Sequence, residues 1–325
     1  MGLLTIERVV VEPEHALSRR TFIGGLAGAA AAIAVGHNAF AAQDATPAPG
    51  RTIETIHGPV VIPANPTRII AINFPSAVAL LELGVIPVGI PNYLPAFPAG
   101  HPTAEGAEVI QNSAGEIDFE VIVRLKPDLI LGSDWTDPTK QLAPYEQLSA
   151  IAPTALFEWT QAAGNWEAEA AGCAEAIGKT AELIAMKEAF ETKAATIKST
   201  YSKALSEITW DLISASNTNW YLYGPTSSHG KVVVLAGVTL GAAKGQTDGY
   251  LELSLEQLNL LENTDVLLTR SFGDETYAEL TKLDTFNNLK AVTGQHLLQT
   301  EFFFPSSYGL SSALLDDVEV GLKSL

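Results

Sequence analysis

Residues 179–205, KTAELIAMKEAFETKAATIKSTYSKAL, contain neither Gly nor Pro. Their apolar side chains recur every three or four positions, which places them on one face of a helix. At ~1.5 Å per residue, such a helix would be ~40 Å long, about the width of a small domain. We interpret the segment as a helix that connects two globular bodies, although an ordinary long surface helix has the same pattern. The residues on this face are Leu183, Met186, Phe190, Ala194, Ile197, Tyr201 and Leu205.

The bulk composition is that of a globular chain with enough apolar residues for two cores. Of its 325 residues, 47% are hydrophobic and 17% are charged. Acidic residues outnumber basic ones 37 to 19, which gives a formal net charge of -18. This charge opposes non-specific attraction to nucleic acid and to anionic lipid, so we expect neither as a partner. With Cys173 as its single cysteine, the chain cannot form an intrachain disulfide.

The N-terminal region is organised like an export signal. The pair Arg19-Arg20 precedes Phe22, and the apolar run GGLAGAAAAIAVG follows. Paired arginines in this position resemble a twin-arginine signal, which carries folded proteins across a bacterial membrane. The run is about 13 residues long, which is too short for a comfortable transmembrane helix. We therefore predict a signal peptide over residues 1–41, a flexible linker over 42–50, and a mature protein in the periplasm or on the extracytoplasmic cell surface.

Compact apolar runs alternate with helical patterns on both sides of the connecting helix. Examples are RIIAINF (68–74) and DLILGS (128–133) before it, and DVLLT (265–269) after it. Short runs of this kind suit strands that are buried on both faces of a sheet. We predict an α/β protein with two α/β lobes and mostly parallel sheets, joined by one long rigid helix. The predicted segments are an N-terminal lobe (51–178), the connecting helix (179–205) and a C-terminal lobe (206–325).

The two halves share a local sequence pattern. EVIVRLKPDLIL (120–131) matches EQLNLLENTDVLL (256–268), which is one residue longer. In each copy a helix opens at a glutamate, and a buried strand is entered through an aspartate, Asp128 or Asp265. We interpret the match as an internal repeat, although two unrelated αβ turns can also resemble each other by chance.

Aromatic side chains recur in the loops that follow the predicted strands. Ligands of open α/β sheets bind at the carboxyl ends of the strands, and apolar walls with few polar anchors are typical of small-molecule sites. Arg270 follows a predicted strand and could bind a carboxylate or hydroxamate oxygen, although an exposed surface arginine fits equally well. We expect about half of the aromatic residues to fold back into the cores. The predicted ligand-binding residues are Phe74, Tyr93, Trp135, Trp159, Trp220, Tyr223, Arg270, Phe272, Phe303 and Tyr308.

Sequence motifs of catalysis are missing. The chain has no Gly-x-Ser-x-Gly elbow, no phosphate-binding loop with Gly-Lys-Ser, and no Gly-x-Gly-x-x-Gly after a strand. Ser228 and His229 are neighbours but lack a third orienting group at a recognisable spacing. The other mature histidines, His57, His101 and His296, are too dispersed to predict a transition-metal site. We predict a non-enzymatic protein without a resident cofactor, and keep an extracytoplasmic hydrolase that uses Ser228 as an alternative.

An ordered set of short motifs resembles the periplasmic iron-siderophore binding proteins of ABC importers. Together they cover nearly the whole mature chain, and binders of vitamin B12 and haem share much of the set. The resemblance implies two lobes bridged by one long helix, with little hinge motion and a largely preformed cleft. The motifs are His57-Gly58, Ile62-Pro63, Pro66, Arg68-Ile-Ile, Gly84-Val-Ile-Pro-Val-Gly, Leu125-Lys-Pro-Asp-Leu-Ile, Tyr223-Gly-Pro, Ala236-Gly237 and Leu315-Asp-Asp-Val.

The resemblance also implies partners. One surface glutamate on each lobe of these proteins docks on arginines of the membrane permease, and the matching residues are Glu120 and Glu256. From the sequence alone, both are acids at helix starts, where they favour the helix dipole. The expected partners are an ABC transporter permease and an iron-siderophore complex, and we expect the protein to be a monomer.

The scarcity of arginine narrows the expected ligand. Relatives that bind ferric triscatecholates resemble one another in clustering arginines in the cleft. Beyond the signal, this chain has only Arg51, Arg68, Arg124 and Arg270, of which Arg270 alone is placed to reach a cleft. We therefore favour a hydroxamate or mixed-donor siderophore, held by aromatic faces and one arginine. Haem or a corrinoid remains an alternative, since both are large and flat.

Overall fold

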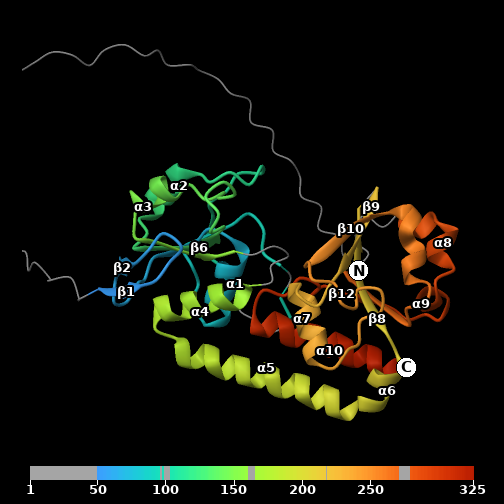
Figure 1. Ribbon diagram of the computed structural model, residues 1–325. Coiled ribbons are helices and arrows are strands. Elements are labelled where there is room, and N and C mark those ends of the chain that lie inside the picture. The colour runs from blue at the N-terminus through green and yellow to red at the C-terminus, as the bar shows by residue number, and fades with distance from the viewer. Residues whose placement is uncertain (1–49, 96, 99–102, 160–164, 217, 271–278) are drawn as a thin grey trace, which may run out of the picture. The chain divides into compact units, whose positions relative to one another are not determined.

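The structure is a computed structural model (Figure 1) that describes residues 50–95, 97–98, 103–159, 165–216, 218–270 and 279–325. The predicted signal peptide and all but the last residue of the predicted linker lie outside these ranges. Thr46–Leu325 forms one compact unit. Among the described residues, no helix has both the length and the hydropathy that crossing a lipid bilayer requires.

The first lobe is built on a five-stranded parallel sheet in the order β5-β4-β3-β6-β7. Strand β6 (Leu129–Asp134) lies between β3 and β7 and starts with the apolar run Leu-Ile-Leu, which is buried because helices cover both faces of such a sheet. A hairpin of β1 (Arg51–Ile53) and β2 (Val60–Ile62) precedes the sheet. The remaining elements are β3 (Ile69–Ala71), α1 (Phe74–Glu82), β4 (Gly89–Ile90), β5 (Glu108–Val109), α2 (Phe119–Leu125), α3 (Tyr145–Ser149), β7 (Thr154–Glu158) and α4 (Trp166–Ile177).

The second lobe is built on a mixed five-stranded sheet in the order β10-β9-β8-β11-β12. Strands β8, β11 and β12 are parallel, but β9 and β10 run antiparallel at one edge. Only three residues join β8 to β9, too few for a crossover helix, so this half is less parallel than predicted. Its elements are β8 (Trp210–Ala215), β9 (Asn219–Tyr223), α7 (Ser228–Leu235), β10 (Tyr250–Ser254), η2 (Leu255–Leu261), β11 (Val266–Arg270), η4 (Leu280–Lys282), α8 (Asp284–Asn287), α9 (Lys290–Thr293), β12 (Leu297–Thr300) and α10 (Tyr308–Ser324).

The connecting helix is interrupted near its end, where the sequence predicts one uninterrupted helix over 179–205. α5 (Thr180–Thr200) is followed by α6 (Ser202–Glu207), and Tyr201 between them has φ -106° and ψ 22°. The Tyr201 hydroxyl donates a 3.0 Å hydrogen bond to Glu319 of α10, which holds this residue against the second lobe. The backbone bonds from Tyr201 N to Ile197 O and from Leu205 N to Tyr201 O remain, at 2.9 and 3.0 Å. The interruption is therefore a local kink.

Helix α5 contacts both lobes. It packs on α4 of the first lobe and on α10 and α7 of the second (Figure 1), and the buried side chains include Phe190 and Ile197 on the predicted apolar face. The Lys193 ammonium lies 2.9 Å from the Ser312 carbonyl oxygen and 2.5 Å from Asp316, both on α10. With 21 residues, α5 spans ~30 Å, enough to run along both lobes.

A second link between the lobes joins α1 to α10. The Glu82 carboxylate accepts hydrogen bonds from the Ser307 hydroxyl at 2.7 Å and from the Gly309 amide at 3.1 Å. Ser307 is the N-cap of α10, where a negative charge is favourable because backbone N–H groups point out of the helix. Tyr308 packs beside this link, edge-on to Trp166 at 4.9 Å between ring centroids. Together with α5, these contacts and the Lys231–Glu167 ion pair, at 3.9 Å between α7 and α4, tie the two lobes to each other.

The predicted internal repeat is visible as matching hydrogen bonds. Asp128 accepts hydrogen bonds from the backbone and hydroxyl of Thr67, at 2.8 and 2.9 Å. Asp265 accepts the same pair from Thr209, at 2.8 and 3.0 Å. Each aspartate precedes a parallel strand, and each threonine lies just before the strand beside it. The repeat is not complete, since the first copy opens an α-helix and the second a 3-10 helix.

Candidate ligand-binding cleft

Aromatic side chains of both lobes enclose a cavity of about 410 Å³, which we call the aromatic cleft. Its first-lobe wall comes from the segments that follow β3, β4 and β7, and its second-lobe wall comes from β9, β10, the end of β11 and the segment after β12. These are the carboxyl ends of parallel strands in the first lobe, where ligands of α/β sheets bind. The lining residues are Phe74, Tyr93, Pro95, Trp159, Tyr221, Tyr223, Tyr250, Arg270, Glu301, Phe303 and Phe304.

The first-lobe wall is centred on Phe74, the first residue of α1. Asn73 caps this helix by accepting a hydrogen bond from the Ser76 amide, which fixes where the helix and Phe74 begin. The Phe74 ring lies edge-on to Tyr93 at 6.1 Å and to Trp159 at 6.4 Å between centroids. These three rings form an apolar wall whose edges and faces can meet a ligand.

The second-lobe wall follows from the alternation of side chains along a strand. Tyr221 and Tyr223 are two residues apart on β9 and therefore share a face. Tyr250 on β10 pairs with Tyr223 in the sheet register. Tyr223 also packs edge-on against Phe303 and Phe304, with centroids 5.5 and 5.6 Å apart. Its hydroxyl is 2.9 Å from the Ser214 hydroxyl, so the ring is fixed at both ends.

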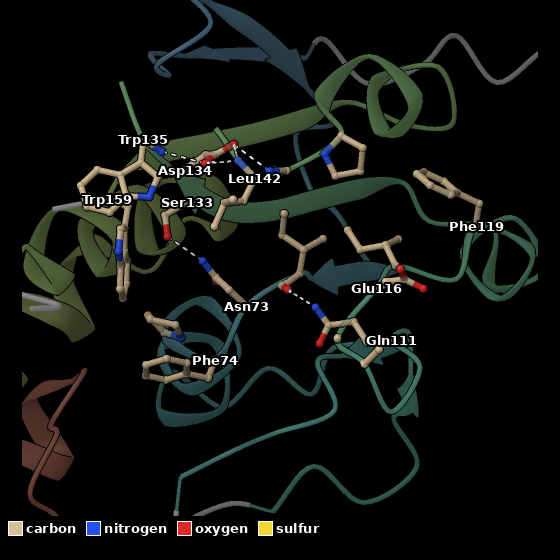
Figure 2. A pocket seen from close by; sticks show the side chains of 17 residues that line it. Asn73, Phe74, Gln111, Glu116, Phe119, Ser133, Asp134, Trp135, Leu142 and Trp159 are labelled. Carbon is tan, nitrogen blue, oxygen red and sulfur yellow. Dashed lines mark hydrogen bonds between the residues drawn. The ribbon is translucent and has the colours of Figure 1, made fainter. Parts of the chain in front are cut away.

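A second cavity, of about 850 Å³, lies within the first lobe, and we call it the first-lobe cavity (Figure 2). It shares Phe74 and Trp159 with the aromatic cleft, so the two spaces border on the same rings. Its polar groups include Asn73, whose amide donates a 2.6 Å hydrogen bond to Ser133. The lining residues are Ile72, Asn73, Phe74, Pro75, Gln111, Ala114, Gly115, Glu116, Ile117, Phe119, Ser133, Asp134, Trp135, Leu142, Ala143, Pro144 and Trp159.

Asp134 shapes the rim of the first-lobe cavity. It is buried at the end of β6 and accepts backbone hydrogen bonds from Trp135 at 2.8 Å, Leu142 at 2.9 Å and Ala143 at 2.8 Å. These bonds close the loop after β6 and bring Trp135 and Leu142 to the cavity (Figure 2). Leu142 is 84% exposed, so it offers an apolar surface to a ligand.

The lining of the two cavities is not basic. Among its described residues, Arg270 is the one cation, and Glu116, Asp134 and Glu301 are carboxylic acids. The sequence adds no Lys or Arg at positions 96, 99–102, 160–164, 217 or 271–278, which the structure does not describe. A ligand with a large negative charge would therefore have Arg270 alone, among the described lining residues, as a cation to pair with.

Seven of the ten predicted ligand-binding residues line one of the cavities. Phe74, Tyr93, Trp159, Tyr223, Arg270 and Phe303 line the aromatic cleft, and Trp135 lines the first-lobe cavity. Phe272 lies outside the described residues. Sequence reasoning left out Tyr250, because no strand is predicted there, and the first-lobe cavity, whose small polar lining has no recognisable pattern.

The structure places the other two predicted residues elsewhere. Trp220 lies between Tyr221 and Asn219 on β9, so strand alternation turns it away from the cleft. It is fully buried, and its indole donates a 2.9 Å hydrogen bond to the Ser254 carbonyl. Tyr308 is the first residue of α10 and packs on Trp166 instead. The prediction that these two residues line the cleft is wrong.

Ser228 cannot act as a nucleophile in this structure. Ser228 and His229 are both fully buried on α7, and neither lines a cavity described here. The Ser228 hydroxyl is 3.5 Å from His229 Nδ1, and burial lowers the pKa of His229 to about 3, which makes the imidazole a weak base for the serine proton. The hydrolase alternative is therefore wrong. Among the described residues, no group of three His, Cys, Asp or Glu side chains could hold a metal ion.

Two α/β lobes, a bridging helix and an aromatic cleft define a class of two-lobed binding proteins. Residues 76–301 match the periplasmic binding protein family, and the chain belongs to this family. The fold agrees with the siderophore periplasmic binding protein from the fuscachelin gene cluster of Thermobifida fusca. That structure aligns with a TM-score of 0.69 at 24% identity, over 81% of this chain and 99% of that one.

Two relatives from Bacillus subtilis (strain 168) are similar in sequence. A protein described as a probable siderophore-binding lipoprotein, YfiY, is 37% identical over 120 residues. This match covers 36% of this chain and 35% of the relative, so it spans about a third of each. The Fe(3+)-citrate-binding protein YfmC is 25% identical over 251 residues, which covers 74% of this chain and 75% of that one. These relatives are binding proteins, and the prediction of a non-enzymatic protein is confirmed on that ground.

Proposed function

We propose that the protein is an extracytoplasmic receptor that binds a ferric siderophore in the aromatic cleft and delivers it to the permease of an ABC importer. The observation that carries this proposal is the cleft itself, with aromatic walls from both lobes and a single arginine. The names of its relatives, which refer to siderophores and to ferric citrate, support iron chelates as the ligand class. The twin-arginine-type signal over residues 1–41 would export the folded chain, which we expect to act as a monomer.

The charge of the lining favours a hydroxamate or mixed-donor chelate. Three hydroxamates neutralise Fe³⁺, whereas three catecholates leave the complex with three negative charges. Bringing such a trianion beside Glu116 and Glu301 costs Coulomb energy, and Arg270 can offset only part of it. Aromatic faces can bind the apolar surface of a weakly charged chelate without this cost.

Permease docking would use equivalent positions on the two lobes. Glu120 lies in the first turn of α2 and Glu256 in the first turn of η2, and both side chains are exposed. The two elements occupy matching places in the internal repeat, each before an aspartate that precedes a parallel strand and accepts hydrogen bonds from a threonine. A repeat of this kind would present two similar acidic points to a partner with basic residues at matching places.

Comparing ferric chelates of different charge tests the proposed ligand class. Trp135 and Trp159 line the cavities, so tryptophan fluorescence of the mature chain should respond to binding. We expect ferrioxamine B, a trishydroxamate complex, to bind at least about 10-fold more tightly than a ferric triscatecholate, a difference of ~1.4 kcal/mol. Arg270→Gln should weaken ferrioxamine B binding by about 10-fold, because a charge-assisted hydrogen bond is lost.

Arg124→Gln is the matched control for that substitution. Arg124 pairs with Glu108 at 2.7 Å on the surface and lines neither cavity, so its loss should leave affinity unchanged. Tighter binding of the triscatecholate, or no response to either chelate, would overturn the proposed ligand class. A haem or corrinoid receptor would instead be recognised by a stoichiometric visible absorption band in the purified protein.

A further inference from the structure

A buried carboxyl group lies behind the wall of the first-lobe cavity. Glu169, on α4, is fully buried. Its Oε1 accepts a hydrogen bond from the Ser76 hydroxyl, whereas its Oε2 has no hydrogen-bond partner among the described residues. A buried carboxylate with one unpaired oxygen is destabilising, and burial of this kind favours the protonated form of the group.

Hydrogen bonds link this carboxyl to two residues that line the cavity. The Ser76 amide donates to Asn73 Oδ1 at 3.3 Å, and Asn73 Nδ2 donates to Ser133 Oγ at 2.6 Å. Figure 2 shows the Asn73 side chain reaching Ser133 across the cavity wall. Ser133 and Asn73 also lie near enough to Glu169 to favour its charged form. A change in the protonation of Glu169 can therefore alter the hydrogen bonds of Asn73 and Ser133, which line the cavity.

Both protonation states of Glu169 are accessible near neutral pH. Burial raises its pKa to about 7, against the opposing effect of Ser76, Ser133 and Asn73. The elements packed on α4 present uncharged groups here, Ser76 from α1 and Ser133 from β6. No charged side chain of β1, β7 or α5 contributes to the shift. The titratable neighbour is Cys173, whose thiol lies 3.6 Å from the Ser76 hydroxyl. Burial raises the pKa of this thiol, so Cys173 stays neutral.

We propose that Glu169 is a positioning residue that sets the direction in which the Ser133 hydroxyl donates, and so couples ligand binding in the first-lobe cavity to proton uptake. This inference rests on the proposed function for its ligand. When Glu169 is charged, nearby hydroxyls serve it as donors. When it takes a proton from solvent, its own O–H donates to Ser133 Oγ, which already accepts from Asn73. With both acceptor sites of Ser133 used, its O–H points into the cavity.

The chemistry of that donor defines the ligand group that it would bind. A hydroxyl that can only donate into the cavity selects an acceptor oxygen, such as the amide carbonyl of a peptide-like siderophore arm. The chelate core would occupy the aromatic cleft, and its arm would pass Phe74 and Trp159, which border both spaces. Because the ligand prefers protonated Glu169, affinity should fall as pH rises through 7.

The ligand-free protein provides a test that does not depend on the siderophore. We expect the side-chain amide resonances of Asn73 to shift with pH, with a midpoint near 7, in the mature wild-type chain. In Glu169→Gln, which keeps the shape but cannot ionise, this titration should disappear. Glu116→Gln is the matched control, because Glu116 is an exposed carboxylate of the same cavity, and it should keep the wild-type midpoint. A static Asn73 resonance in the wild type, or an unchanged titration in Glu169→Gln, would overturn the inference.

Binding of ferrioxamine B at pH 6 and pH 8 tests the coupling to ligand. The wild type should bind about 10-fold more weakly at pH 8, as expected for one linked proton with a pKa near 7. Glu169→Gln should bind equally at both pH values, near the affinity of the wild type at pH 6. Ser133→Ala should also lose the pH dependence, but its affinity at both pH values should be near that of the wild type at pH 8. A Glu169→Gln variant that keeps the wild-type pH profile would contradict the coupling. If ferrioxamine B does not bind at all, the proposed function fails, and the Asn73 titration still decides the role of Glu169.

Discussion

Replacing Glu120 and Glu256 together by alanine is expected to abolish uptake of the ferric chelate by cells while its affinity for the protein stays unchanged. Both glutamates are exposed and neither lines a cavity described here, so ligand contacts remain intact. Removing one partner of an interfacial charge pair costs about 2–5 kcal/mol, and the double substitution would remove two such pairs. Cellular uptake of radioactive iron, compared with fluorescence titration of the purified variant, measures the two effects separately.

Controls for this experiment come from glutamates in similar settings. Glu146 lies in the first turn of α3, and Glu262 directly follows η2, so both are exposed acids on the same two lobes. Replacing this pair by alanine changes the net charge equally and should leave uptake intact. Undiminished uptake by the Glu120→Ala, Glu256→Ala protein would show that docking uses other residues.

The second large effect is expected from the rings shared by the two cavities. Phe74→Ala and Trp159→Ala should each weaken ferrioxamine B binding by about 30- to 150-fold, because central aromatic anchors contribute roughly 2–3 kcal/mol to binding. Phe74 and Trp159 border both cavities, so each truncation removes apolar contact from two parts of the ligand. Calorimetric titration would measure the change directly.

Phe302→Ala is the matched control for the aromatic wall. Phe302 is half-buried beside Phe303 in the sequence but lines neither cavity, so affinity should change by less than about 2-fold. Thermal unfolding of each variant separates lost binding from lost folding. If both Phe74→Ala and Trp159→Ala kept full affinity, the ligand would not bind against this aromatic wall.

Contacts between the lobes hold the two walls of the aromatic cleft in place. α5 packs along both lobes, and Glu82 ties the end of α1 to the N-terminus of α10. A cleft held in place by such contacts loses less conformational freedom on binding, which favours affinity.

The features predicted best from the sequence are those that a pattern of several residues indicates. A face of apolar residues over 179–205 predicted the connecting helix, and apolar runs bounded by Gly and Pro predicted the buried strands. The match of 120–131 with 256–268 predicted equivalent positions, which the bonds of Asp128 and Asp265 confirm. The kink at Tyr201 was not predictable, because it depends on contact with α10, far away in the sequence.

The site was predicted less completely, because the face of a sheet on which a side chain lies depends on the register of its strand. Trp220 and Tyr221 are adjacent on β9, yet one is in the core and the other in the cleft. Only the pairing of β9 with its neighbours decides which face each residue occupies. The first-lobe cavity was missed because its shape comes from a loop closed by the buried Asp134, whose role is invisible before folding.

The position of iron in a crystal of the mature chain with ferrioxamine B tests the central claim most directly. Anomalous scattering at the iron absorption edge should give a single peak between Phe74 and Trp159 on one side and Tyr223 and Arg270 on the other. A peak on the outer surface of either lobe, or fully formed crystals with no bound iron at saturating chelate, would contradict an aromatic cleft that receives a ferric siderophore.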